Sequence, residues 1–190
     1  MNKKTGKHLV LYGLLLSFVI LAVTVLLYYF RLFLNLSIPR IFESIFIILN
    51  VASNFLVVTG FLVVFLSDRK LLDLLITFAF IAAYALNFAQ STGLFNPYAY
   101  GEVAAIKAVN ILTFVTLIPY ALWFMRLLKT TSVGAISVVL SVLVALFVPS
   151  MIATYFSPAD EMFLLLTVIL NVVICALRTF AAFLDTKTLK

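Results

Sequence analysis

The feature that most constrains this chain is a series of long apolar stretches separated by short polar turns. A helix needs about 20 mostly apolar residues to cross the hydrocarbon core of a bilayer. Residues 9–30 carry no charged side chain, and five further stretches of similar length follow. The six expected spans cover residues 9–30, 41–67, 71–95, 103–125, 132–156 and 160–184. The sequence therefore predicts an all-α integral membrane protein, a bundle of six transmembrane helices in a single polytopic domain over residues 1–190.

The composition favours membrane helices over a soluble fold or a β-barrel. Of the 190 residues, 65% are hydrophobic and 11% are charged, and the mean hydropathy is +1.25. A soluble domain is nearer half apolar and a quarter charged. Barrel strands are about ten residues long and alternate apolar with polar residues. These stretches are longer and apolar on every side, so we expect helices.

The basic residues predict the orientation of the bundle. All but three of the 13 lysines and arginines fall on one side of the expected membrane, and the exceptions are Arg31, Arg40 and Lys107. By the positive-inside rule, both termini are then cytoplasmic. The net charge of +6 is thus a signal of topology, and we expect the bilayer and no nucleic acid as partner. Short loops with this charge bias are typical of a bacterial cytoplasmic membrane.

The basic start followed by an apolar stretch resembles a secretory signal peptide, but two features argue against cleavage. The stretch is longer than a typical signal-peptide core, and no small-residue cleavage site follows it. Tyr28, Tyr29 and Phe30 instead suit an aromatic belt at the outer interface. We therefore expect residues 9–30 to be retained as a membrane anchor.

Polar side chains at bilayer depth are candidates for function, because they are costly there. Most of those in this sequence fall in the outer half of the second, third and fourth expected spans. The candidate pocket residues are Glu43, Asn50, Asn54, Asn87, Gln90, Lys107 and Asn110. Two hypotheses account for them: interhelical hydrogen bonds that hold the bundle together, or a polar pocket between these spans.

Two basic residues lie inside the expected spans. Lys107 can extend to the outer headgroups, pair with Glu43, or attract an anionic solute or lipid headgroup. Arg178 is predicted to extend toward the cytoplasmic interface. Among the glycines, Gly13, Gly60 and Gly134 form no GxxxG pair, and close helix approach at alanines such as Ala82 and Ala83 is expected only as ordinary packing.

The residues of common catalytic and metal sites are scarce. His8 is the only histidine and Cys175 the only cysteine, so a bis-histidine haem, a histidine-rich metal site and an iron–sulfur site are excluded within one chain. No nucleophile-elbow, phosphate-loop or zinc-protease motif is present. We expect no cofactor, no metal and no catalytic residues, and hence not an enzyme.

The sequence leaves two function classes open. The first is a non-catalytic multi-pass membrane protein, a subunit or scaffold that packs against a membrane partner or against copies of itself. The second is a small transporter or binder of a lipid or solute, which would use the polar outer-half pocket. The scarcity of catalytic and ligand-binding motifs favours the first.

Overall fold

Every element that can be described in the computed structural model is a helix. The structure describes residues 2–34, 40–92, 94, 118–127 and 161–187. They form α1 (Lys3–Leu34), α2 (Arg40–Asp68), α3 (Leu71–Ser91), a short helix at residues 118–127, and α6 (Glu161–Lys187). The predicted all-α class is confirmed for this part of the chain, and the predicted spans at 103–125 and 132–156 lie mostly outside it.

Two of these helices are long and apolar enough to cross a membrane, over Lys3–Leu27 and Ser44–Asp68. In α3 the apolar segment is shorter, over Leu71–Leu86. The first helix begins well before the uncharged stretch, because Asn2 caps it: the Asn2 side-chain oxygen accepts a hydrogen bond of 3.1 Å from the backbone N–H of Lys4. The basic residues that precede the apolar stretch are therefore helical.

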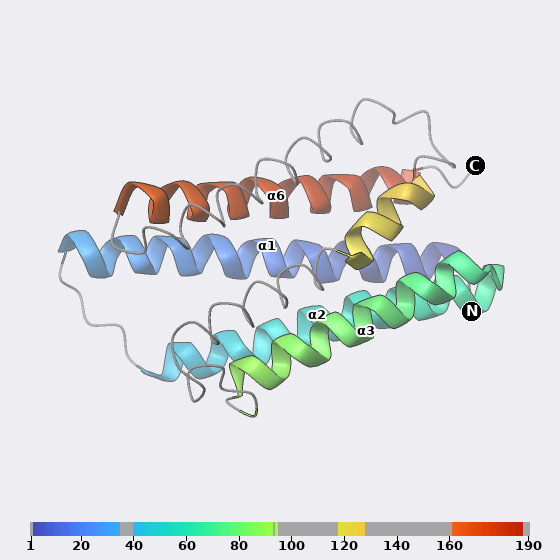
Figure 1. Cartoon of the computed structure of the whole chain (residues 1–190), viewed down its shortest axis with the longest axis horizontal. Coiled ribbons are helices and arrows are strands. Elements are labelled where there is room, and N and C mark those ends of the chain that lie inside the picture. The colour runs from blue at the N-terminus through green and yellow to red at the C-terminus, as the bar shows by residue number, and fades with distance from the viewer. Residues whose placement is uncertain (1, 35–39, 93, 95–117, 128–160, 188–190) are drawn as a thin grey trace.

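The central element is α1, which packs against α2 on one side and α6 on the other, while α3 packs against α2 (Figure 1). Two hydrogen bonds to adjacent carbonyls of α1 mark this position. The Ser53 hydroxyl donates to the Gly13 carbonyl at 2.7 Å, and the Thr179 hydroxyl donates to the Leu14 carbonyl at 3.2 Å. Consecutive residues of α1 thus bond to both neighbouring helices.

Glycines bring α1 and α2 into backbone contact. A Cβ atom built on Gly13 would lie 2.8 Å from the Ser53 carbonyl oxygen, and one built on Gly60 would lie 2.7 Å from the Gly6 carbonyl oxygen. Neither position has room for a side chain. The contact uses Gly6 and Gly13 on one helix and Gly60 on the other, so it needs no GxxxG pair within either helix.

The link between α2 and α3 is a tight reversal. Arg69 has a φ of 51°, and its backbone N–H bonds to the Phe65 carbonyl. A left-handed residue directly after a helix is a common way to end it, although glycine usually occupies that position. The reversal places α2 and α3 antiparallel, as expected for sequential helices joined by a short link.

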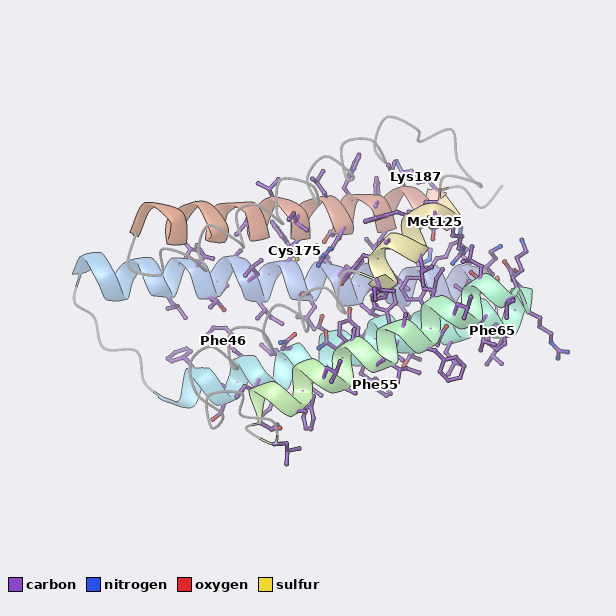
Figure 2. All side chains as sticks on the ribbon, in the orientation of Figure 1. Phe46, Phe55, Phe65, Met125, Cys175 and Lys187 are labelled. Atoms are coloured by element: carbon purple, nitrogen blue, oxygen red, sulfur yellow. The ribbon has the colours of Figure 1, made fainter. Side chains whose placement is uncertain are left out.

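The core lies where α1, α2, α3, the 118–127 helix and α6 meet, and it is rich in aromatic rings. Phe61 and Phe80 stack with centroids 4.7 Å apart, and Trp123 meets Phe61 edge-on at 5.7 Å. All three side chains are almost fully buried. Large apolar side chains also cover the outside of the helices, and Phe55 of α2 is 68% exposed (Figure 2).

Candidate functional site

The predicted outer pocket is only partly within the described residues. Glu43, Asn87 and Gln90 belong to α2 and α3, but their side chains are not described, and Lys107 and Asn110 lie outside the described residues. Asn50 is exposed on α2, and Asn54, one turn further along the helix, is partly buried. The pocket therefore stays a prediction.

At Asn50 the surrounding surface is apolar. The neighbouring Ile47 and Val51 are also exposed, with 41% of each accessible. The structure gives the Asn50 amide no hydrogen bond to any described residue. Thr24, an exposed polar residue of α1, differs because its hydroxyl donates to the Ile20 carbonyl of its own helix at 2.8 Å.

Charged side chains gather at the opposite end, where α1 begins and α6 ends. Lys7 Nζ lies 2.6 Å from a carboxylate oxygen of Asp185 and donates to the Asp185 backbone carbonyl at 2.8 Å. Both side chains are buried, at 6% and 7% exposure. Lys3 pairs with Asp68 of α2 in a more exposed position. These pairs tie α1 to both of its neighbours.

A third ion pair joins α3 to the 118–127 helix. Arg126 Nη1 lies 3.1 Å from a carboxylate oxygen of Asp73, and the Asp73 side chain is 1% exposed. Neither Asp73 carboxylate oxygen accepts a well-directed hydrogen bond from the described residues. Buried ion pairs of this kind hold elements in place, because removing one partner leaves an uncompensated charge.

Further from this end, two tyrosines and an arginine form a polar cluster in the core. The guanidinium carbon of Arg178 lies 3.6 Å from the centroid of the Tyr120 ring, and the Tyr120 and Tyr84 hydroxyls are 3.2 Å apart. Arg178 is partly buried. The planar head of Arg178 stacks on an aromatic ring of another helix, which is favourable for a cation, and its extension toward the cytoplasmic interface stays a prediction.

A shallow apolar groove of about 380 Å³ separates α1 from α6. Its lining includes Tyr12 and Leu15 from α1 and Ala176 and Phe180 from α6. The buried Cys175 lies on α6 where that helix faces α1 (Figure 2). Within the described helices no three His, Cys, Asp or Glu residues come close enough to hold a metal ion.

Comparison with known proteins gives no relative: no family model, no curated protein and no solved structure matches the chain. The structural features above are therefore the basis for any functional proposal.

Sequence reasoning missed the ion pairs and the tyrosine–arginine cluster. In the sequence, Lys7, Arg126 and Arg178 indicate only the orientation of the bundle or an interfacial position. A signal existed for Asp73 and Asp185, because each is a carboxylate at the end of an apolar stretch, where a buried base is its usual partner. Which base pairs with each carboxylate depends on which helices pack together. The spacing of residues along the sequence does not show this packing.

Proposed function

We propose that this protein is a non-catalytic, six-span integral membrane protein that acts as a subunit or scaffold, with both termini in the cytoplasm. The observation that carries the proposal is the exposed Asn50 on α2. A membrane-facing amide has no water to bond with, and Asn side chains in spans commonly hydrogen-bond to a neighbouring helix. In the proposed assembly, the neighbouring helix belongs to a second polypeptide and covers the Asn50 face of α2.

The arrangement of charge supports the same proposal. Asp68, Asp73 and Asp185 each form an ion pair with a lysine or arginine at one end of the bundle. The remaining described surface is largely apolar, with exposed side chains such as Phe55, Leu66 and Phe78. Internal charge pairing combined with an apolar exterior suits a protein whose contacts are with lipid and other helices.

The experiment is native mass spectrometry after extraction from the native membrane in mild detergent. We expect a second polypeptide at fixed stoichiometry, either another copy or a different chain. Asn50→Leu should release it, because leucine offers no interhelical hydrogen bond. Thr24→Val is the matched control, because the Thr24 hydroxyl already bonds within its own helix and should not be needed for assembly.

A lone wild-type chain would contradict the subunit proposal, and so would an assembly that survives Asn50→Leu unchanged. Equal loss in the Thr24→Val control would also contradict it, because the effect would then not be specific to the Asn50 face.

The six-span topology has its own test. In a Cys175→Ala background, single cysteines at Asn2, Lys70 and Asn96 are labelled in intact cells with a membrane-impermeant maleimide. We expect labelling at Asn96 alone, with the other two positions reacting only after the membrane is permeabilised. Labelling at Asn2 in intact cells would overturn the proposed orientation.

A further inference from the structure

Arg178 is a cation placed well inside the bundle. It lies seven residues before Asp185 on α6, or about 10 Å along the helix axis at 1.5 Å per residue. Its guanidinium stacks on Tyr120, and the Tyr120 hydroxyl in turn contacts the Tyr84 hydroxyl. A charge at this depth is costly unless it is matched by an anion or by several hydrogen bonds.

The carboxylates nearest to Arg178 along the chain and at the charged end already face other bases. Asp185 pairs with Lys7, and Asp73 and Asp68 likewise each have a basic partner. Glu161 begins α6 and is 17 positions before Arg178, about 25 Å away along the axis. Each carboxylate whose side chain the structure describes thus already has a basic partner other than Arg178.

The part of the chain outside the described residues adds little negative charge. The sequence from residue 103 to residue 159 contains no aspartate or glutamate. Residues from this stretch can therefore approach Arg178 only with neutral or basic side chains. Residues 103–159 therefore supply no carboxylate that could pair with the positive charge of Arg178.

The geometry of the cluster leaves hydrogen-bond donors available. Stacking occupies the flat face of a guanidinium, while its five N–H groups point outward in the plane. The structure gives none of them a hydrogen bond to a described residue. Two hydroxyls that share one hydrogen bond use one proton, so the Tyr84–Tyr120 pair retains a second proton to donate.

We propose that Arg178, together with the Tyr84–Tyr120 hydroxyl pair, binds an oxyanion: the phosphate of a lipid headgroup or of a small solute. A guanidinium fork matches a phosphate with two parallel hydrogen bonds, and the tyrosine hydroxyl supplies a third donor. Tyr120 keeps the guanidinium plane in place. This site lies between the charged end and the predicted outer pocket, since Tyr84 comes three residues before Asn87 on α3, and it does not depend on the subunit proposal.

The test uses the full chain in nanodiscs of phosphatidylcholine, with or without phosphatidylglycerol. Native mass spectrometry counts the phosphatidylglycerol retained, and thermal unfolding in phosphatidylcholine nanodiscs detects stabilisation by inorganic phosphate over chloride. Arg178→Gln should weaken binding about tenfold or more, the equivalent of one charge-assisted hydrogen bond. Arg178→Lys should weaken it less, because the charge remains but the fork is lost.

Arg69→Gln is the matched control, since it removes an exposed arginine that no aromatic ring accompanies. Retained phosphatidylglycerol identifies a lipid headgroup as the ligand, and stabilisation by inorganic phosphate identifies a solute. The proposal is overturned if wild type binds neither, if Arg178→Gln binds as wild type does, or if Arg69→Gln loses as much. If Arg178→Gln does not fold, Tyr84→Phe decides: weaker binding supports the site and unchanged binding overturns it.

Discussion

The two sides of α1 are packed by different means. Toward α2, glycines let the backbones meet, and no side chain fits between Gly13 and Ser53 or between Gly60 and Gly6. Toward α6, an apolar groove of about 380 Å³ remains open, and the helices are joined by the Lys7–Asp185 pair and the Thr179 hydrogen bond. We call these the glycine seam and the groove seam. The first is a close contact between backbones, and the second leaves a groove that polar contacts bridge.

The largest expected effect is the loss of the ion pair in the groove seam. Lys7→Met should destabilise the protein by about 3–5 kcal/mol, because Asp185 is then left buried without its lysine. Lys3→Met is the matched control and should cost less than about 1 kcal/mol, since the Lys3 side chain is 32% exposed. Unfolding in mixed detergent micelles, followed by circular dichroism, measures both.

A double variant separates the ion pair from simple loss of packing. Lys7→Met combined with Asp185→Leu should recover most of the stability, because replacing both charges with apolar groups removes the buried charge altogether. If the double variant is as unstable as Lys7→Met, the groove seam does not depend on charge pairing.

The next effect is on the glycine seam. Gly13→Ala should cost about 1–3 kcal/mol, because the added methyl would lie 2.8 Å from the Ser53 carbonyl oxygen and 2.7 Å from Val57 Cγ2. The backbone has to move apart, which also strains the Ser53 hydrogen bond to the Gly13 carbonyl. The same unfolding assay checks it. Stability within about 0.5 kcal/mol of wild type would show that α1 and α2 do not meet backbone to backbone.

We expect a smaller loss of stability when either of the two hydrogen bonds to the adjacent α1 carbonyls is removed. Thr179→Val should cost about 0.6 kcal/mol, the average for interhelical hydrogen bonds in a membrane, because the hydroxyl also bonds to the Cys175 carbonyl of its own helix. Ser53→Ala should cost more, since Ser53 is fully buried and its bond is shorter, at 2.7 Å. If Thr179→Val and Ser53→Ala lower the free energy of unfolding equally, the two hydrogen bonds stabilise the protein to the same extent, and the two seams do not differ in this respect.

The contrast between the seams also explains which features the sequence could predict. The apolar stretch at residues 41–67 nearly coincides with α2, because a long apolar run with a single charge, at Glu43, has few structures other than a helix. The Lys7–Asp185 pair joins residues 178 positions apart and follows from the packing of α1 against α6, which no local pattern encodes. Among the candidate pocket residues, Asn50 and Asn54 are four residues apart and so lie on one helix face, but spacing alone could not show that Asn50 would be exposed.

The smallest expected effect tests what occupies the groove. Ala176 lines it, and Ala176→Leu adds three carbon atoms to that lining. Acyl chains are as apolar as leucine, so exchanging lipid contacts for leucine contacts should change the free energy of unfolding by less than about 0.5 kcal/mol. Gly13→Ala adds a single carbon on the other side of α1 and should cost more, so the smaller substitution has the larger effect. A loss above about 1 kcal/mol for Ala176→Leu would instead mean that protein fills the groove, because only a packed neighbour resists an added side chain in this way.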